Sequence, residues 1–267
     1  FWTFRLTLQL LTSHLKLLAL NLIMVQIAGY LKTSLIEWPG KIAAVIFVPG
    51  CNFRCPFCHN SDLSDPQKQP KLTFFEEGEI FADLKKRQKW VDAIVVTGGE
   101  PTLQPELAGF LKELKKMGFL TMIETNGSKP ETITRLLKDG LIDFVAMDYK
   151  GNFDNYQNFI NVKCQMSNVK SSMELILKSG IGCEFRTTVV PGLHNEKILI
   201  QMAGEIRSLI ENCKLKIVNY RWVLQNFRPT NCLDLRFSEL KPFTSGELKQ
   251  SLKIVQKIIP TAEIRGD

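Results

Sequence analysis

Short apolar runs that resemble strands alternate with helix-like segments from residue 41 to the C-terminus. The strand-like runs are rich in β-branched residues and span 42–48, 93–97, 119–124, 143–148, 183–190 and 215–225, with a short run at 262–265. The segments between them carry apolar residues at helical spacing and span 75–90, 105–118, 130–140, 172–180, 195–210 and 245–259. Strands that alternate with helices form right-handed βαβ units, so the sequence predicts an α/β fold with a parallel sheet. Both an open doubly wound sheet and a partial barrel fit this pattern.

The first 23 residues differ from the rest of the chain, because they are Leu-rich and do not begin with Met. The longest uncharged stretch that includes part of them, 17–31, is shorter than the about 20 apolar residues of a membrane span. The basic region and cleavage site typical of a signal peptide are missing. We favour the interpretation that Met24 is the natural start and that residues 1–23 are an upstream-translated extension. No linker or low-complexity tract interrupts residues 24–267, which we expect to form a single domain.

The chain carries 34 Lys and Arg against 27 Asp and Glu, a formal net charge of +7. The excess is spread along the sequence in short pieces such as 85–87 and 115–116, without interleaved aromatic residues. Such pieces are typical of solvated helix faces and not of a nucleic-acid groove. We therefore expect neither a nucleic-acid nor a membrane partner.

Polar or glycine-rich residues stand at the ends of five successive strand-like runs or directly after them. These segments are Cys51–Cys58, Gly98–Glu100, Glu124–Gly127, Asp148–Lys150 and Arg186–Pro191. In parallel α/β folds the active site lies at the carboxyl ends of the strands. Taken alone, Gly98–Glu100 would be a plain turn, and its position after the second strand makes it a candidate part of the site. Asp148 with Lys150, taken alone, would be a surface ion pair at a strand end.

Three cysteines lie within the stretch CNFRCPFCHN, residues 51–60. The total of seven is odd, which disfavours a secreted disulfide framework and favours a metal-binding thiolate cluster in a reducing compartment such as the cytoplasm. The other four are isolated, and we expect small buried apolar side chains at Cys164, Cys183, Cys213 and Cys232.

Three closely spaced thiolates do not complete the usual metal sites. Structural zinc takes four ligands, and His59 directly after Cys58 is poorly placed for a closed site. A ferredoxin run needs a fourth cysteine, and a redox Cys-X-X-Cys pair leaves Cys51 without a role. An iron–sulfur cube held at three corners remains, with one iron open for an external ligand and for chemistry at the metal.

The spacing CX3CX2C, with Phe57 before the last cysteine and Gly98-Gly99-Glu100 after the next strand, resembles the radical S-adenosylmethionine (SAM) superfamily. The resemblance implies a partial (β/α)6 barrel in which Cys51, Cys55 and Cys58 hold a 4Fe–4S cluster whose open iron binds SAM. The reduced cluster then cleaves SAM to methionine and a 5′-deoxyadenosyl radical. It also implies that Phe57 and His59 lie near the adenine, and that Gly98, Gly99 and Glu100 contact the methionine amino group.

Further stretches resemble the anaerobic ribonucleotide reductase activating proteins, namely KTSLIEWPGKIAAVIF, VVTGGEPTLQ, ETNG, AMDYK and RTTVVPG. This similarity spans about residues 27–229, with TAEIRG near the end. It implies a radical SAM oxidoreductase that abstracts a hydrogen atom from a glycine of a partner reductase, with a flavodoxin- or ferredoxin-like electron donor. It also implies that the SAM pocket is lined by Glu124, Asn126, Asp148 and Lys150.

Two departures from the family pattern and three alternative functions accompany this interpretation. The family usually has Asp at the position of Glu124, and the His that pyruvate formate-lyase activating enzymes carry after the sixth strand is replaced by the segment 224–227. Pyruvate formate-lyase activation, a small-molecule enzyme similar to deazapurine carboxylate synthases, and a non-catalytic iron–sulfur or zinc module are the alternatives. We further expect the loop 32–40 to form part of the site mouth, with Trp38 and Pro39 contacting the partner. For His194, an exposed or capping position and a site role fit equally well.

Overall fold

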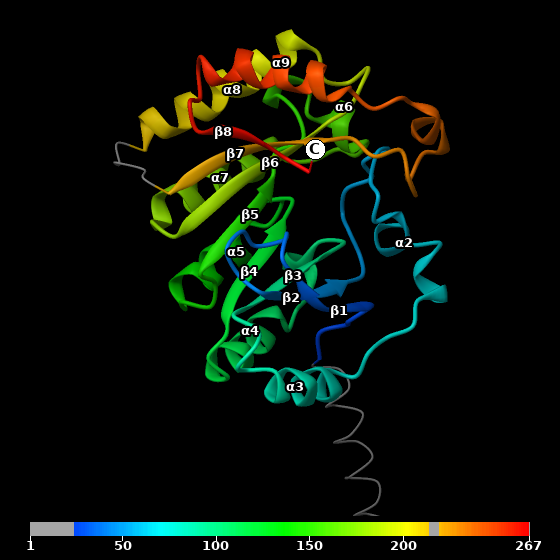
Figure 1. Cartoon of the computed structure of the whole chain (residues 1–267), viewed down its shortest axis with the longest axis vertical. Helices are drawn as coiled ribbons and strands as arrows, with labels where there is room; N and C mark the ends of the chain where they lie inside the picture. The colour runs from blue at the N-terminus through cyan, green and yellow to red at the C-terminus, as the bar shows by residue number, and fades with distance from the viewer. Residues whose placement is uncertain (1–23, 214–218, 267) are drawn as a thin grey trace, which may run out of the picture.

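A computed structural model describes residues 24–213 and 219–266. The interpretation of residues 1–23 and the first residues of the predicted strand 215–225 fall outside this range. The described part forms an eight-stranded sheet (Figure 1). Its strands are β1 (Gly29–Ser34), β2 (Ala43–Val48), β3 (Ala93–Gly98), β4 (Leu120–Thr125), β5 (Phe144–Asp148), β6 (Gly182–Val189), β7 (Tyr220–Asn226) and β8 (Ala262–Arg265).

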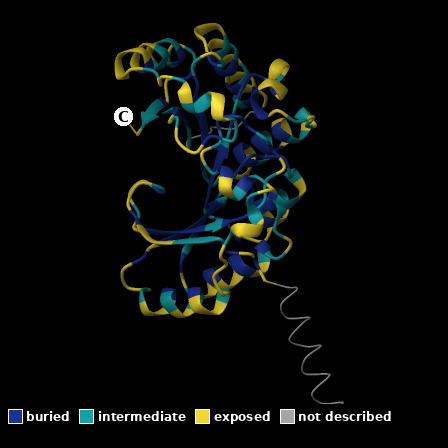
Figure 2. Ribbon diagram, turned by 90° about the vertical axis from the view of Figure 1, so that its right-hand side faces the viewer, coloured by how far each residue is buried: buried dark blue, intermediate teal, exposed yellow. Residues whose placement is uncertain are grey.

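The strands lie in the sheet in the order in which they follow one another along the chain. β1 pairs antiparallel with β2, and each later pair is parallel. A doubly wound sheet would reverse its strand order at a switch point, whereas a barrel adds each strand on the same side. The sheet curves strongly and stays open between β1 and β8 (Figure 2). The α/β fold with a partial barrel of parallel strands is therefore confirmed, and the doubly wound alternative is wrong.

Helices cover the outer face of the curved sheet (Figures 1 and 2). The longer ones are α3 (Glu77–Lys86), α4 (Leu107–Lys116), α5 (Pro130–Lys138), α7 (Met166–Ser179), α8 (Glu196–Asn212) and α9 (Ser245–Gln256). Short turns of helix are α2 (Ser61–Ser64), α6 (Gln157–Ile160), η1 (Gln69–Lys71), η2 (Pro101–Leu103), η3 (Phe153–Asn155) and η4 (Leu235–Glu239). Within the described residues, no helix is both long enough and apolar enough to cross a membrane.

Local capping explains where several helices begin and end. Thr244 and Glu247 form a reciprocal capping box at the start of α9, and the side chain of Asn195 accepts the N–H of Ile198 in the first turn of α8. Gly180 ends α7 in the left-handed conformation at φ +78°. α7 begins before the predicted residue 172 because its first turns carry polar residues, which hide the helical period of the apolar ones.

The core lies on both faces of the sheet. Ala44, Ile46 and Val48 of β2 face the helices and join the large outer core, whereas Ala43 and Val45 face the barrel interior. The inner apolar cluster is small; it consists of Trp38, Ala43, Val45, Ala93, Val95, Met122, Phe144 and Ala146. The alternation between two buried faces is why the strands read as continuous apolar runs in the sequence.

The sequence reasoning missed β1. This strand is a half-exposed edge strand of mixed polar and apolar residues, so it lacks the apolar run that marks the others. Its outer edge is covered by α3 and the turn after it, because Arg87 donates to the Lys32 carbonyl at 2.6 Å and Tyr30 donates to Asp83 at 2.7 Å. The predicted loop 32–40 is therefore strand as far as Ser34.

Candidate active site

A cavity of about 470 Å³ lies inside the barrel at the carboxyl ends of the strands. Its size is in the range of pockets that hold a cofactor or substrate. Every predicted strand end contributes to its wall; the lining includes Cys51, Cys55, Cys58, Gly98, Gly99, Asn126, Asp148, Lys150, Arg186, Gln225 and Arg265. The prediction that these separate segments meet at one place is confirmed.

The barrel interior is layered. Below the cavity lies the inner apolar cluster, to which Val95 and Ala146 belong. Two residues further along the same strands, Thr97 and Asp148 line the cavity. Successive inward side chains of a strand are two residues apart, so one step along each strand changes the interior from apolar to polar.

The cysteine-bearing loop follows β2 and is fixed by backbone hydrogen bonds. The N–H of Cys58 donates to the Cys55 carbonyl at 3.1 Å, and the N–H of Arg54 donates to Ile160 at 2.9 Å. The side chain of Asn60 donates to the Gly98 carbonyl at 3.2 Å and ties this loop to the end of β3. All three thiol side chains reach the same cavity as a result.

The thiols fit a cluster better than a single ion. In the described part of the chain, no three His, Cys, Asp or Glu side chains converge closely enough to bind one metal ion. A cube takes each thiolate at a separate iron, so its ligands surround a larger space. Burial raises the pKa of Cys51 to about 11 and of Cys55 to about 12, so these groups are thiols until a metal displaces their protons.

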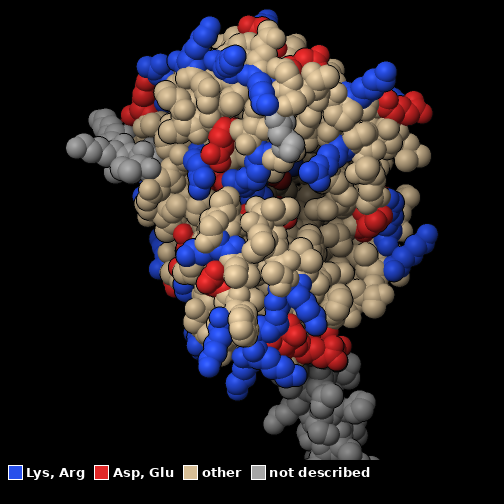
Figure 3. Space-filling model, in the orientation of Figure 1, with Lys and Arg blue, Asp and Glu red and all other residues tan. Residues whose placement is uncertain are grey.

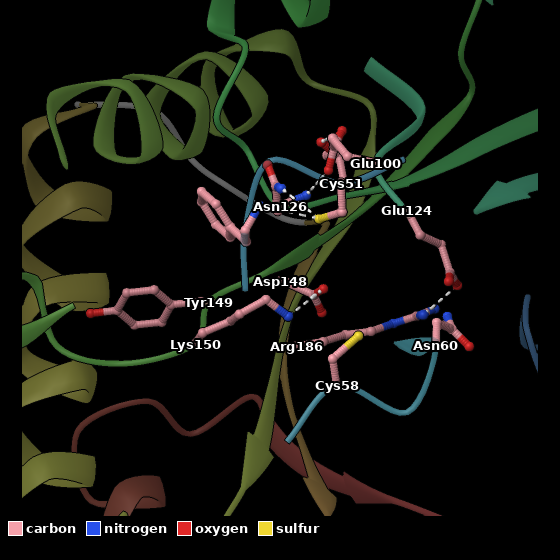
Figure 4. Close-up of polar contacts among 12 residues, drawn as sticks. Cys51, Cys58, Asn60, Glu100, Glu124, Asn126, Asp148, Tyr149, Lys150 and Arg186 are labelled. Carbon is pink, nitrogen blue, oxygen red and sulfur yellow. Dashed lines mark hydrogen bonds and ion pairs between the residues drawn. The ribbon is translucent and has the colours of Figure 1, made fainter. Parts of the chain in front are cut away.

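Polar groups surround the sulfur of Cys51. The N–H of Phe53 donates to it at 3.4 Å, and Nδ2 of Asn126 lies 3.8 Å away (Figure 4). Nδ2 of Asn126 also donates to Asn52 at 2.9 Å, and Oδ1 of Asn126 accepts the N–H of Ser128 at 2.9 Å. Hydrogen bonds to ligating sulfurs stabilise negative charge there and tune the potential of a cluster.

The two glycines after β3 are required by backbone packing. Gly98 has φ +118°, and a Cβ there would lie 2.4 Å from the carbonyl oxygen of Val48. A Cβ on Gly99 would lie 2.0 Å from the carbonyl oxygen of Gly50. Any larger residue would displace the chain just before Cys51. These glycines line the cavity and also set the position of the cysteine loop.

Glu100 does not belong to the cavity wall. It is fully buried, and its carboxylate accepts hydrogen bonds from the N–H and hydroxyl of Thr102, the hydroxyl of Thr125 and the N–H of Asn126. Burial raises the pKa of this carboxyl, and these donors act in the opposite direction. The geometry is that of a brace between the ends of β3 and β4. The predicted contact of Glu100 with a ligand stays a prediction.

A chain of charged groups crosses the polar layer. Arg186 donates to Glu124 and, at 2.5 Å, to Glu184, and Arg265 binds both oxygens of Glu184 at 2.6 Å. Thr97 donates to the second oxygen of Glu124 at 2.7 Å. Burial disfavours charge on Glu184, but the two arginines outweigh it and hold its pKa below the usual range.

Glu124 is therefore engaged by protein groups, although it lines the cavity. Its extra methylene, relative to the Asp of the resemblance, spans the distance to Arg186 (Figure 4). The segment that begins at Arg186 was expected at the site, but no role was predicted for Arg186 itself. The signal was present in the sequence, because Glu184 and Arg186 are the only charged residues of this strand and lie two apart, so they share one face of it.

Asp148 and Lys150 form an ion pair of 2.9 Å inside the cavity, which excludes the simple surface pair (Figure 4). Burial alone would lower the pKa of Lys150, but the carboxylate of Asp148 outweighs it and raises the pKa well above its usual range. Lys150 therefore presents a permanent cation. Tyr149 between them points the other way and donates its hydroxyl to Glu205 of α8.

His194 contacts the backbone of Lys150. It is only 2% exposed, so the exposed alternative is wrong. Its Nδ1 accepts the N–H of Val190 at 3.0 Å, which leaves the proton on Nε2 to be donated to the Lys150 carbonyl at 2.9 Å. Burial lowers the pKa of His194 to about 4, so the ring is neutral at physiological pH.

Phe57 and His59 both border the cavity. Phe57 is buried and packs against Phe237, with ring centroids 6.5 Å apart, whereas His59 is exposed at the rim.

Cys183, Cys213 and Cys232 are buried as expected, but Cys164 is only partly buried. Lys and Arg side chains are spread over the face in Figure 3 in separate groups with acidic ones beside them.

Comparisons with known proteins agree with this geometry. The model of the radical SAM superfamily matches residues 45–200. A protein of Methanocaldococcus jannaschii named as a glycyl-radical enzyme activating enzyme is 35% identical over 247 residues, which cover 90% of this chain and 95% of the relative. The pyruvate formate-lyase-activating enzyme of Clostridium pasteurianum is 27% identical over 236 residues, which cover 85% of this chain and 94% of that enzyme.

Among solved structures, Streptococcus suis SuiB bound to its precursor peptide SuiA has a similar fold. The TM-score is 0.63 at 17% identity, and the match covers 83% of this chain. The chain spans about half of the length of SuiB, 48%. This similarity concerns the fold alone.

Proposed function

The chain belongs to the radical SAM superfamily, and we propose that it activates a glycyl-radical enzyme by abstracting a hydrogen atom from one of its glycines. The observation that carries this proposal is similarity to two named activating enzymes along at least 85% of the chain. Anaerobic ribonucleotide reductase is the partner that we propose, on the motifs given above. We place the reaction in the cytoplasm, because free thiols fit a reducing compartment.

Members of this superfamily use a 4Fe–4S cluster and SAM. Cys51, Cys55 and Cys58 would hold the cluster, and when bound the two groups supply a reductively generated, hydrogen-abstracting radical. The rest of the cavity wall offers partners for SAM. These are the backbone at Gly98 and Gly99, the amide of Asn126, the ammonium of Lys150 and the rim at Phe57 and His59.

The residues of this chain would orient the two groups and shield them from water. Glu100 would hold Asn126 beside Cys51, and His194 would hold the backbone of Lys150 so that its side chain reaches Asp148. Glu124 and Arg186 would keep the opposite wall in place. No protein side chain is needed as a general base, because the cofactor carries the chemistry.

A macromolecular substrate is compatible with an open barrel. The sheet is not closed between β1 and β8, and the cavity is lined by residues near both edges, such as Glu37 and Arg265. An electron must also reach the cluster, and a flavodoxin- or ferredoxin-like protein is the donor that we propose.

Anaerobic reconstitution tests the proposal. We expect the protein to bind iron and sulfide, and to form 5′-deoxyadenosine from SAM under a strong reductant. With a candidate anaerobic ribonucleotide reductase it should also give a glycyl radical in electron paramagnetic resonance. The Cys51→Ala, Cys55→Ala, Cys58→Ala variant is the control and should lose all three properties. Turnover of the small substrate of deazapurine carboxylate synthases without any partner would instead support that alternative.

A further inference from the structure

The sulfur of Cys58 meets a buried hydroxyl group. Oγ of Ser64, on α2, lies 3.5 Å from Sγ of Cys58, which is within hydrogen-bonding distance for sulfur. Ser64 is only 2% exposed and lines the same cavity as the three cysteines. Among the residues that the structure describes, this sulfur is the one hydrogen-bond partner of the hydroxyl. Buried polar groups are normally paired, so the contact with Cys58 accounts for the hydroxyl of Ser64.

The chemical state of Cys58 decides which of the two atoms donates. In the thiol form, either the S–H or the O–H group can donate. A thiolate that ligates a metal carries no proton, so the hydroxyl of Ser64 is then the donor and the sulfur is the acceptor. Hydrogen bonds to an ionised acceptor are also stronger than those between neutral groups. Ligation of a metal by Cys58 would therefore fix the hydroxyl in one orientation and strengthen the contact.

Hydrogen bonds of the surrounding turn hold Ser64 at this distance. The N–H groups of Leu63 and Ser64 both donate to the Asn60 carbonyl at 3.0 Å. The N–H of Gly50 donates to the Leu63 carbonyl at 2.8 Å, and the side chain of Asn60 donates to the Gly98 carbonyl at 3.2 Å. The turn that carries Ser64 is thus attached both to the start of the cysteine loop and to the end of β3.

Asn231, from the segment after β7, holds α2 from the other side. Its backbone is in the left-handed conformation at φ +52°, which asparagine adopts more readily than most residues. Its Oδ1 accepts the hydroxyl of Ser61 at 3.0 Å, and its Nδ2 donates to the His59 carbonyl at 3.2 Å. Two segments far apart in the sequence therefore position the helix on which Ser64 lies.

The other two cysteine sulfurs have different polar neighbours. The side-chain amide of Asn126 lies 3.8 Å from the sulfur of Cys51. At Cys55 burial raises the pKa, and the ammonium of Lys150 acts in the opposite direction. In the view of Figure 4, Cys51 and Cys58 lie on opposite sides of the Lys150 side chain. The three sulfurs are thus served by groups from three separate elements, and only a hydroxyl serves Cys58 in the described part of the chain.

We propose that Ser64 raises the reduction potential of the cluster by donating a hydrogen bond to the ligating sulfur of Cys58. Reduction adds one electron from the external donor protein to the cluster, while the hydroxyl proton stays on the oxygen of Ser64. A donor at a ligating sulfur stabilises the added negative charge, so it favours the reduced form over the oxidised one. The inference rests on the part of the proposed function in which the cysteines hold a cluster, and the identity of the partner enzyme does not enter it.

A purely structural role in α2 is the alternative for Ser64. A hydroxyl that only supports the turn contributes to folding and leaves the reduction potential unchanged. Ser61 separates the two roles, because it is fully buried on the same short helix and its hydroxyl contacts Lys68 at 2.7 Å and Asn231 at 3.0 Å instead of a sulfur. Ser61→Ala should therefore lower stability without changing the potential.

The test is a redox titration of the reconstituted full-length protein without SAM, followed by electron paramagnetic resonance of the reduced cluster. The variants are Ser64→Ala, Ser64→Thr and Ser64→Val, with Ser61→Ala as the matched control. Thr keeps the hydroxyl, and Val has nearly the same shape without it, so the difference between these two variants isolates the hydrogen bond from packing. Iron and sulfide are counted in each variant before the titration.

We expect Ser64→Ala to bind as much iron and sulfide as the wild type. Its equilibrium constant for one-electron reduction should fall about threefold to tenfold, which lowers the potential by about 30–60 mV. Ser64→Thr should have a potential close to that of the wild type, whereas Ser64→Val should resemble Ser64→Ala. Ser61→Ala should titrate as the wild type does.

An unchanged potential in Ser64→Ala, or equal potentials in Ser64→Thr and Ser64→Val, overturns the proposal. An equal shift in Ser61→Ala also overturns it, because the effect then comes from α2 as a whole. If Ser64→Ala does not retain iron, the comparison of Thr with Val decides, and loss of iron in Ser64→Thr as well assigns Ser64 a packing role and rejects the proposal.

Failure of the proposed function gives a different result. A wild-type protein that binds no iron–sulfur cluster refutes the proposed function and this inference together. A wild-type cluster that is reduced and cleaves SAM but gives no glycyl radical with any reductase rejects the proposed partner, while the shift in Ser64→Ala still supports the role of Ser64.

Discussion

The carboxylate of Glu100 accepts the backbone N–H of Asn126 at 2.6 Å, so the second residue after β3 is joined to the residue that follows β4. Asn126 in turn places its side-chain amide 3.8 Å from the sulfur of Cys51. A fully buried acid thus acts on the cysteine loop through a neighbour, without reaching the cavity itself. In this structure the glutamate of the Gly-Gly-Glu motif therefore holds Asn126 in place and does not line the cavity.

Replacing Glu100 by Gln tests this brace. The amide NH2 would face donors that now meet a carboxylate oxygen, which leaves buried groups unpaired. We expect a loss of about 1–3 kcal/mol in the free energy of unfolding by urea, and weaker retention of iron. Glu113→Gln changes an exposed carboxylate on α4 and should have little effect on either quantity. Equal stability of the two variants would contradict the assignment.

Gly99→Ala should disturb the cysteine loop. The new Cβ would lie 2.0 Å from the Gly50 carbonyl oxygen, so the backbone before Cys51 must move. We expect a reduced iron content after reconstitution and a lower thermal midpoint. Gly204→Ala is the matched control, because nothing lies within 4 Å of its added Cβ in α8 and alanine favours helix by about 0.5–1 kcal/mol. Full iron content in Gly99→Ala would be the contrary result.

Arg186→Met should destabilise the protein strongly. Arg186 is 7% exposed and pairs with Glu124 and Glu184; its loss would leave Glu124 without a cationic partner and Glu184 with Arg265 alone. Removing one partner of a buried ion pair costs about 3–5 kcal/mol. Arg207→Met breaks an exposed pair with Glu211 on α8 and should change little. The free energy of unfolding of both variants is measured by chemical denaturation. A loss for Arg186→Met as small as that for Arg207→Met would contradict the prediction and would mean that the acids are well hydrated.

His194 predicts a particular dependence of stability on pH. Its pKa of about 4 lies below the ordinary value of 6.5, so the unfolded chain binds more protons between these values. Stability from this residue is present above pH 6.5 and is lost as the pH falls. Between pH 7.5 and 5.5 the loss should be about 1 kcal/mol. Measured by urea denaturation, the stability difference between wild type and His194→Gln should shrink by that amount, and a constant difference would refute it.

Much of the fold could be read from the sequence. Apolar runs such as 93–97 and 143–148 are buried on both faces, so period and composition identified them without any help from tertiary contacts. The meeting of their polar ends at one site then followed from the rule that parallel strands have their carboxyl ends at the same edge of the sheet. β1 could not be found in this way, because an edge strand with exposed Lys32 and Thr33 has neither an apolar run nor a strict alternation.

The candidate site was predictable as a set of residues but not as a set of contacts. Cys51, Asn126 and Lys150 meet at one cavity as expected. The burial of Trp38 and the inward turn of Glu100 depend on loop geometry, which spacing does not encode. The pairing of Glu124 with Arg186 joins residues 62 positions apart, and only the curvature of the sheet brings them together.

Along each strand, positions that stabilise the fold and positions that line the cavity lie only two residues apart. In β3, Val95 secures the scaffold and Thr97, two positions later, faces the chemistry. Substitutions at cavity-lining positions such as Thr97 can change the substrate, while positions in the inner apolar cluster such as Val95 keep the fold. A lineage of such proteins could therefore acquire new substrates by point mutation without first having to survive a less stable ancestor.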